Sequence, residues 1–481
     1  FARYERICQF FTRPDQNLYG TAQQWSKVYD FVSCYAYPFM FSNGGEAWDP
    51  ATGQVEGIAN SEINVAGLEH NKRFLQYAPP GATNYGIAEE VDVFTAGTIA
   101  TPLVLVAGGI WGPLLGRMLG TAVPLMPCEH LYAITTPLAS LAGETREVVH
   151  PMLRDQDRAM YYRQHADRYA VGSYQHRPLL VDAGEIRPHG APPAAGTPVT
   201  NMHGEAHDMP SLRPWPAEHF EAAWADARRL MPELATARQA YTLDGMFSFT
   251  PDGFPIMGES TAVRGAWIAE AVWLTHGGGV GRVMADWITD GDPGFDTHEL
   301  HLDRFEPVQT SRAYVRARGA RNYDEVYDLV HPLQPLGVAR PLRLAPFHDR
   351  LEELGAVFFE GKGFERAQWF ETNRPDPAAA RTGWAAQFWS ASVATEHRAA
   401  RERVAIFDLT SLTRAVVEGP DAEAFLQRMA TNDLGGPVGS VVYSAMCTPR
   451  GGVRSDITAT RLAEDRYQLG CNGPQDVLYL R

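Results

Sequence analysis

Apolar and polar residues alternate in several short segments of this chain, and such alternation is typical of β-strands. Residues 131–136 alternate and end in β-branched residues, while residues 160–165 and 168–174 flank a two-residue turn and predict a hairpin. Between residues 216 and 231 the apolar positions keep helical spacing, and a proline stands at each end. This part of the chain is therefore expected to form a largely antiparallel sheet covered by a helix.

The longest apolar stretch covers residues 100–126, where Arg117 is the only charged residue. Its length would suffice to cross a bilayer, but glycines and prolines interrupt it and no aromatic belt frames it. A buried strand over residues 103–106, a turn at Gly108-Gly109 and a helix from Trp111 to Leu119 explain the pattern better. A strand, glycine turn and helix in this order suit a nucleotide-binding α/β layer, so we expect no membrane span.

A second glycine-rich helix start follows a Pro251-Asp252-Gly253 turn and a strand-like segment at residues 266–269. The glycine run at residues 277–281 opens onto helical spacing over residues 280–288. A helix that begins in glycines presents backbone N–H groups and a positive dipole end without side chains in the way. Such an end can bind a group that becomes negatively charged during a reaction, although an ordinary helix start has the same pattern.

Composition narrows the class of protein. With 481 residues and 45% hydrophobic residues, the chain is long enough for about two or three domains with buried cores. A formal net charge of −15 argues against a nucleic-acid partner and against an anionic membrane surface. The cysteines are scattered without a CxxC pair, which indicates thiols in a reducing compartment such as the cytoplasm, with no disulfide framework and no metal site: Cys8, Cys34, Cys128, Cys447 and Cys471.

The TPDGxPxxG pattern that ends at Gly258, the segment at residues 271–276 and the glycine-rich helix start resemble the closing part of FAD-dependent amine oxidoreductases. The particular group contains dimethylglycine oxidase, dimethylglycine dehydrogenase and sarcosine dehydrogenase. The resemblance runs from about residue 99 to the end of the chain and includes residues 304–309 and 331–335.

This resemblance implies an FAD cofactor and a set of residues that contact it. The set joins the loop before the glycine-rich helix, the first turn of that helix and the turn after the first buried strand: Val272, Trp273, Leu274, Thr275, Gly277, Gly278, Gly279, Gly109 and Trp111.

The beginning of the chain does not follow the family pattern. Residue 1 is Phe, and the GxGxxG turn that holds the FAD pyrophosphate in such proteins occurs nowhere in the sequence. Residues 1–84 are therefore expected to be an aberrant segment of unclear fold, and the dinucleotide-binding half to be lost or replaced. His70 lacks the neighbours of the histidine that carries a covalent flavin in some relatives, so it is not assigned that role.

Two residues are candidates for amine chemistry. His130 stands at the expected mouth of a strand and Tyr161 in the expected hairpin. Taken alone, a strand histidine is usually only hydrogen-bonded and a strand tyrosine usually packs. The resemblance implies that both line the substrate side of the flavin, where an imidazole and a phenol can tune and relay the proton of an amine.

The last third of the chain resembles two further parts of these proteins. Residues 305–378 resemble the middle connecting domain, and residues 375–380 form a linker. Residues 379–481 resemble the start of the aminomethyltransferase fold, carried by residues 407–410, 417–422 and 431–434. In that family the residues that match Tyr443 and Asp456 lie beside tetrahydrofolate, although a solvated strand carboxylate is the ordinary explanation of Asp456.

The expected protein is therefore a multidomain α/β and α+β chain. A partial FAD-binding domain of the D-amino-acid-oxidase type, with an antiparallel substrate sheet, occupies residues 85–304 and precedes the middle and aminomethyltransferase-like domains. The expected activity is oxidative demethylation of dimethylglycine or sarcosine. The one-carbon unit would pass to tetrahydrofolate, and oxygen or an electron-transfer flavoprotein would accept the electrons. Two alternatives remain open: a flavin-free, ligand-binding remnant, and a related oxidoreductase for another amine or a D-amino acid.

Overall fold

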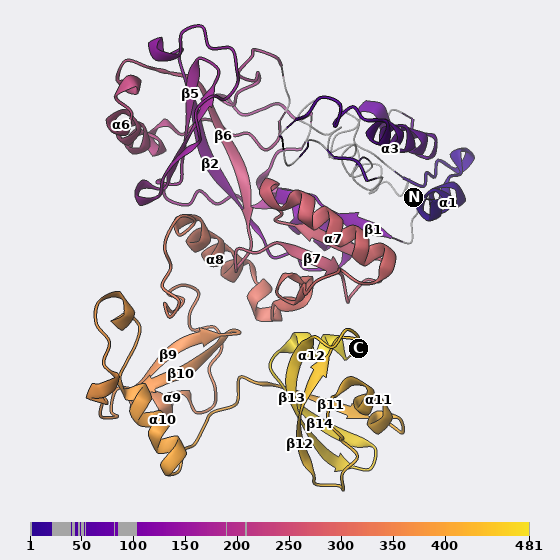
Figure 1. Ribbon diagram of the computed structural model, residues 1–481, viewed down its shortest axis with the longest axis vertical. Coiled ribbons are helices and arrows are strands. Elements are labelled where there is room, and N and C mark those ends of the chain that lie inside the picture. Colours follow the sequence, from indigo (N-terminus) through magenta and orange to yellow (C-terminus); the bar gives the residue numbers. More distant parts are fainter. Residues whose placement is uncertain are drawn as a thin grey trace.

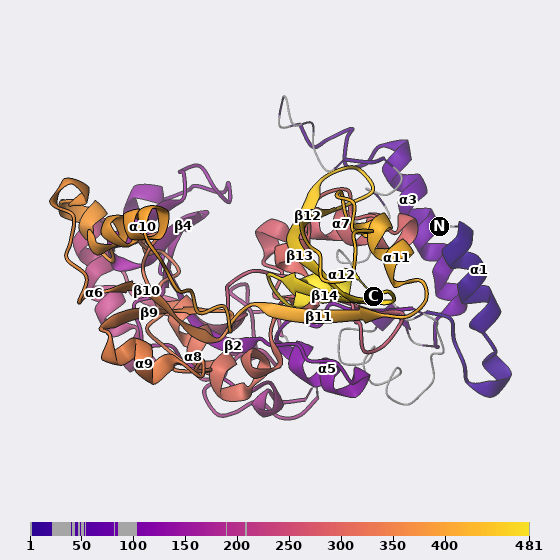
Figure 2. The ribbon, with the colours of Figure 1, turned by 90° about the horizontal axis from the view of Figure 1, so that it is seen from below.

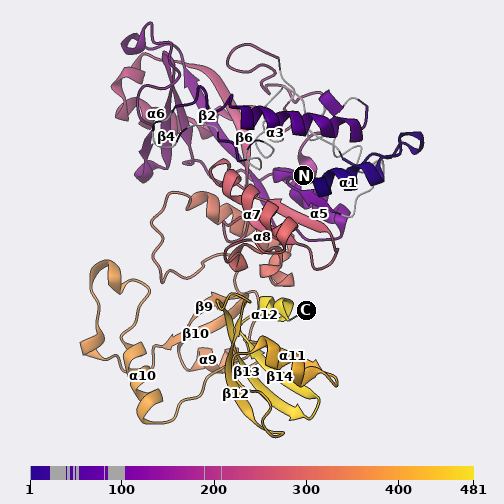
Figure 3. The same ribbon diagram turned by 45° about the vertical axis from the view of Figure 1, so that its right-hand side comes forward.

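The structure is a computed structural model that describes residues 2–21, 40, 44–46, 49, 52, 54–80, 82–84, 103–188, 190–206 and 209–480. The expected start of the flavin part at residue 85, the onset of the resemblance near residue 99, and Cys34 lie outside the described residues. Ahead of residue 85 the structure describes two helices, α1 (Ala2–Phe11) and α3 (Glu62–Arg73), which lie close together in Figures 1 to 3.

A small sheet carries the two glycine-rich helix starts. Its strand order is β1-β8-β7, with β1 (Val104–Val106) parallel to β8 (Ala266–Glu270) and β7 (Ile256–Glu259) antiparallel to β8. After β1 the chain makes a 3₁₀ turn at Gly109–Trp111 and enters α5 (Gly112–Leu119), as the apolar stretch predicts. After β8 it enters α7 (Gly277–Asp290) through a similar 3₁₀ turn at Leu274–His276.

A five-stranded antiparallel sheet follows in the order β3-β4-β5-β2-β6. Its core lies on one face, where Leu131, Met160 and Tyr162 pack against α6 (Glu221–Leu230) through Ala223 and the N-cap residue Phe220. The hairpin of β4 and β5 forms as predicted. The bounds of the strands are Met126–Thr135 for β2, Leu153–Asp155 for β3, Met160–His165 for β4, Arg168–Ser173 for β5 and Gln239–Phe249 for β6.

Two expected boundaries differ from the structure. His130 lies inside β2 and not at its mouth, because Met126 to Cys128 already pair with Phe249 to Phe247 of β6. The helix expected from residue 216 begins only at Glu221, since the proline is followed by a separate 3₁₀ turn at Ala217–His219.

The rest of the chain forms two further units that lie beside each other below the oxidoreductase part in Figures 1 and 3. Helix α8 (Arg312–Asp324) leads to the first unit, in which β9 (Ala356–Gly361) and β10 (Phe364–Phe370) form a hairpin with α9 (His348–Glu353) and α10 (Ser392–Glu402).

The second unit is a four-stranded antiparallel sheet in the order β11-β14-β13-β12, with its own core around Leu426, Met446, Tyr467 and Leu469. Its strands are β11 (Thr413–Glu418), β12 (Val441–Cys447), β13 (Val453–Ala463) and β14 (Arg466–Cys471), and its helices are α11 (Ala422–Met429) and α12 (Pro474–Tyr479). Within the described part of the chain, no helix combines the length and the apolar character that crossing a membrane requires.

Candidate functional site

The two glycine-rich helix starts meet at one edge of the small sheet. Because β1 and β8 run parallel, the turn at Gly108-Gly109 and the segment from Val272 to Gly279 both leave from the carboxyl ends of their strands. In open α/β sheets this edge is where cofactors bind. The structure thus brings together the two groups of residues that the sequence predicts to contact FAD.

The first turn of α7 fits the reactive ring of a flavin. Residues 274–279 are exposed, and a Cβ atom added at Gly277, Gly278 or Gly279 would meet no other atom within 4 Å. N–H groups in the first turn of a helix have no acceptor inside the helix, so they are available to an anionic group in this open space. The described residues therefore fit the flavin end of FAD. Trp273 is half-buried in front of this turn, whereas Leu274 is almost fully exposed.

Glu270, the last residue of β8, connects the two segments. Its Oε1 accepts a 2.7 Å hydrogen bond from the N–H group of Gly108, and Gly112 provides the space for its carboxyl group. The side chain is only 1% exposed, and its Oε2 has no hydrogen-bond partner among the described residues. Burial raises the pKa of Glu270 to about 8, so the carboxyl is mostly neutral at pH 7. Gly109 has a positive φ of 57°, which a glycine adopts at little cost.

The predicted catalytic residues form a pair on the face of the large sheet that α6 does not cover. His130 Nε2 and Tyr161 Oη share a hydrogen bond of 2.8 Å. The two side chains come from β2 and β4, which are separated by β5, and the ring of Tyr161 crosses β5 over Gly172. A Cβ atom at Gly172 would lie 2.0 Å from Tyr161 Cζ, so only glycine leaves room for the ring.

Burial keeps both members of this pair neutral. It lowers the pKa of His130 to about 3, an effect to which His176 adds, and it raises the pKa of Tyr161 far above its usual range. His130 Nδ1 is also buried and has no hydrogen-bond partner among the described residues. The imidazole therefore has one nitrogen that is held by Tyr161 and one that is buried without a hydrogen-bond partner among the described residues.

Aromatic rings enclose His130. Its ring lies 4.3 Å from the ring of Tyr174 and 4.7 Å from that of Phe247, measured between centroids. Phe247 stacks at 5.7 Å on Trp273 of the predicted flavin segment, and Tyr327 lies 5.2 Å from Tyr174. We call Tyr161, Tyr174, Phe247, Trp273 and Tyr327 the aromatic enclosure. It connects the predicted flavin loop with the His130–Tyr161 pair in one cluster.

The predicted folate residues also lie together. Tyr443 of β12 donates a 2.9 Å hydrogen bond to Asp456 Oδ2 of the neighbouring β13, and Asn472 donates one of 2.7 Å to Asp456 Oδ1. These hydrogen bonds, that from Asn472 first, lower the pKa of Asp456. The result is an exposed, oriented carboxylate, which fits the polar edge of a pterin.

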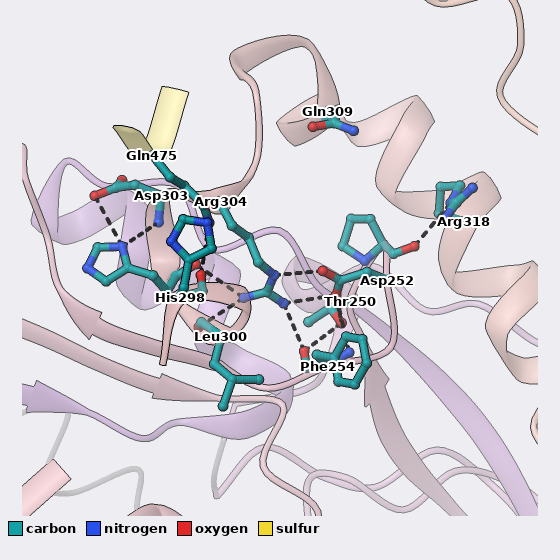
Figure 4. A network of polar contacts seen from close by, with 12 residues as sticks. Thr250, Asp252, Phe254, His298, Leu300, Asp303, Arg304, Gln309, Arg318 and Gln475 are labelled. Carbon is teal, nitrogen blue, oxygen red and sulfur yellow. Dashed lines mark hydrogen bonds and ion pairs between the residues drawn. The ribbon is translucent and has the colours of Figure 1, made fainter. Parts of the chain in front are cut away.

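A cavity of about 310 Å³ lies where the three parts of the chain meet, lined by residues such as Arg318, Glu360 and Gln475. Figure 4 shows its wall, in which Arg304 donates from Nε and Nη2 to the carboxylate of Asp252 at 2.6 and 2.8 Å. The Arg304 side chain is 6% exposed, so this pair fixes the Pro-Asp-Gly turn from within the fold.

Sequence reasoning missed several members of the site, namely Glu270, Asn472 and the rings of Tyr174, Phe247 and Tyr327. Strand periodicity places alternate residues on one face, but it does not say which strands are neighbours. Trp111, which follows the Gly108-Gly109 turn, is partly buried and packs against a small cluster of Ile110, Val181 and Ile186. Among the described residues no group of three or more His, Cys, Asp or Glu side chains could hold a metal ion.

Three family models match consecutive parts of the chain. FAD dependent oxidoreductase matches residues 70–287, FAD dependent oxidoreductase central domain matches residues 290–345, and GCVT N-terminal domain matches residues 347–480. The order of the three parts is the order that the sequence resemblance predicts.

Curated relatives agree with this arrangement. The chain is 32% identical to 4-methylaminobutanoate oxidase (formaldehyde-forming) of Paenarthrobacter nicotinovorans over 77% of its own length and 42% of the relative. It is 29% identical to human mitochondrial sarcosine dehydrogenase, over 79% of the chain and 42% of the relative. Human mitochondrial dimethylglycine dehydrogenase is 26% identical, over 88% of the chain and 47% of the relative.

The chain spans less than half the length of these relatives. Within that span three features are consistent with the same family. They are the three consecutive family matches, the glycine-rich edge of the small sheet and the enclosed histidine–tyrosine pair. The chain belongs to the FAD-dependent amine oxidoreductase family that includes sarcosine dehydrogenase and dimethylglycine dehydrogenase.

Proposed function

We propose that this chain is the amine-oxidising part of an enzyme that removes a methyl group from an N-methylated amino acid such as dimethylglycine or sarcosine. The observation that carries the proposal is the His130–Tyr161 pair inside the aromatic enclosure, which also contains Trp273 of the flavin segment. Aromatic faces attract methylated ammonium groups, and the pair supplies the polar atoms that an amine needs.

In this proposal FAD, when bound at Gly109, Trp111, Val272 to Thr275 and Gly277 to Gly279, supplies the acceptor for a hydride from the N-methyl carbon. Only the unprotonated amine has the lone pair that assists loss of this hydride. When Nε2 accepts the phenol proton of Tyr161, the neutral imidazole carries its own proton on Nδ1, and its role is to donate a hydrogen bond from Nδ1 to the lone pair of the amine and so to favour the deprotonated form. Tyr161 holds the imidazole through Nε2, and the aromatic enclosure excludes water around the amine.

We extend the proposal to the C-terminal part as the place where the one-carbon unit reaches tetrahydrofolate in the whole protein. Asp456 is the group that would orient the pterin, held by Tyr443 and Asn472. Oxygen or an electron-transfer flavoprotein would accept the electrons.

The proposed domain boundaries are those expected from the sequence, at residues 84, 304 and 378. We place the protein in the cytoplasm, where Cys128 and Cys471 stay thiols.

The experiment is anaerobic reduction of the purified, FAD-loaded chain by dimethylglycine, sarcosine or 4-methylaminobutanoate, followed at the visible flavin band. We expect one of these amines to bleach the band. His130→Gln should slow the reduction by about 100-fold, because general acid–base groups contribute on that scale.

His150→Gln is the matched control, since His150 forms a second histidine–tyrosine pair with Tyr169 (2.7 Å) outside the aromatic enclosure. A chain that binds no FAD, or whose flavin stays oxidised with all three amines, would contradict the proposed function. Equal reduction rates for wild type and His130→Gln would remove His130 from the mechanism.

A further inference from the structure

An arginine lies at the border of the aromatic enclosure. Arg154 is the central residue of β3, and its antiparallel partner on β4 is Tyr161. Directly paired residues in an antiparallel sheet have their side chains on the same face. Arg154 therefore shares a face with Tyr161, on the side of Tyr161 that is remote from His130.

The guanidinium group of Arg154 is turned toward the enclosure. Its Cζ lies 5.3 Å from the centre of the Tyr327 ring, and Tyr327 in turn contacts Tyr174, whose ring lies against His130. Two ring contacts thus separate the guanidinium group from the imidazole.

Arg154 differs from the other arginines around it in having no carboxylate partner among the described residues. Arg146 pairs with Glu144 at 2.8 Å, Arg158 with Asp155 at 3.0 Å and Arg163 with Glu147 at 3.2 Å. In a chain with 57 acidic and 42 basic residues, an arginine in this region would normally find an acidic neighbour. The ring of Tyr327 orients the guanidinium group and leaves its N–H groups available.

We propose that Arg154 binds the carboxylate of the substrate and so makes the site specific for N-methylated amino acids over N-methylamines that carry no acid group. This inference rests on the proposed function. Guanidinium groups bind carboxylates through two parallel hydrogen bonds, which fix direction as well as position. With its acid group at Arg154, a substrate directs its amine across Tyr161 toward His130.

The test measures binding without turnover. The probe is (methylthio)acetate, which has a sulfur atom in place of the amine and keeps the carboxylate; 2-(methylthio)ethanol is the same thioether without the acid group. Isothermal titration calorimetry with the FAD-loaded chain gives the Kd of each. We compare wild type with Arg154→Met, Arg154→Lys and, as a matched control, Arg238→Met, an exposed arginine directly before β6.

We expect the Kd of (methylthio)acetate to rise about 30-fold in Arg154→Met, because a charged hydrogen-bonded pair is lost. Arg154→Lys should raise it by less, about 5-fold, since lysine keeps the charge but not the paired donors. Arg238→Met should leave it unchanged, and 2-(methylthio)ethanol should bind all four proteins equally. Arg154 is an exposed strand residue, so these variants are expected to fold.

Equal (methylthio)acetate binding by wild type and Arg154→Met, or no binding to wild type, overturns the carboxylate site. The two proposals fail separately. If none of the three amines reduces the flavin but (methylthio)acetate binding depends on Arg154, the proposed function falls and the carboxylate site remains. If an amine reduces the flavin with the same half-saturating concentration in Arg154→Met, the site falls and the function remains.

Discussion

At the scale of single residues, the position of Tyr161 depends on Gly172, which does not take part in any chemistry. We predict that Gly172→Ala slows flavin reduction by at least about 10-fold, because the new methyl group forces the Tyr161 ring away from His130. Stopped-flow reduction under anaerobic conditions measures this effect.

A double-mutant cycle with Tyr161→Ala separates this mechanism from general damage to the sheet. If Gly172 acts through the ring, adding Gly172→Ala to Tyr161→Ala produces no further loss. Two effects that multiply would contradict the proposed role of Gly172, as would a reduction rate unchanged in the single variant.

Glu270 connects the stability of the cofactor edge to pH. Its folded pKa of about 8 is above the ordinary value of 4.5, so the stability associated with the neutral acid is complete below about pH 4.5 and is lost as the pH rises toward 8. Glu270→Gln keeps an oxygen for the N–H group of Gly108 and cannot ionise. We predict that wild type loses about 3 kcal/mol of unfolding free energy between pH 5 and pH 8 that Glu270→Gln does not lose.

Urea unfolding at both pH values measures this difference. Glu259→Gln on the adjacent β7 is the control, because Glu259 also accepts a backbone hydrogen bond, from Gly265 at 2.6 Å, but is only half-buried. Parallel pH profiles for wild type and Glu270→Gln would show that Glu270 is not held neutral.

At the scale of elements, an added carboxylate in the first turn of α7 should affect helix stability and flavin binding in opposite directions. A carboxylate near a helix N-terminus stabilises the helix, but here it would occupy the open space in front of Gly278 and repel an anionic flavin. We therefore predict that Gly278→Asp weakens FAD binding by at least about 10-fold without lowering the thermal stability of the apoprotein.

Gly281→Asp is the matched control, since Gly281 is also unobstructed but lies about one turn further along α7. FAD titration followed by flavin fluorescence gives the Kd of each variant. Equal loss of affinity in both would mean that the added charge acts at long range, and no loss in Gly278→Asp would exclude this helix end from the flavin site.

The elements themselves could be predicted from local patterns, but most of their partners could not. Alternation and glycine turns predicted β1, the hairpin of β4 and β5, β8 and α7, because these signals are contained within about a dozen residues. The bond between Glu270 and Gly108 joins residues 162 positions apart, and it depends on the parallel pairing of β1 with β8. His130 and Tyr161 were predicted through family resemblance, whereas the role of Gly172 between them depends on strand order.

At the scale of the whole molecule, the C-terminal sheet has a hydrophobic core of its own, and polar contacts join it to the rest of the chain. Lys362 of the connecting unit donates to the carbonyl of Asn472 at 2.6 Å, and Gln475 donates to that of His298 at 2.9 Å. Arg450 pairs with Asp292 at 2.7 Å, in a position where both side chains are substantially exposed. Exposed ion pairs of this kind contribute little to stability, about 1 kcal/mol or less each.

The C-terminal sheet is therefore expected to unfold separately from the rest of the chain. We predict two transitions in differential scanning calorimetry of this chain, and two fully buried leucines distinguish them. Leu469→Ala removes a core side chain of the C-terminal sheet and should lower only one transition, whereas Leu131→Ala in the core of the large sheet should lower only the other. Leucine-to-alanine changes in such cores cost about 2–5 kcal/mol, which is enough to resolve the shift. A single transition that both substitutions lower would mean that the polar contacts at the junction couple the units strongly. In that case the cavity at the junction would belong to one cooperative structure, because its walls could separate only if both cores unfolded.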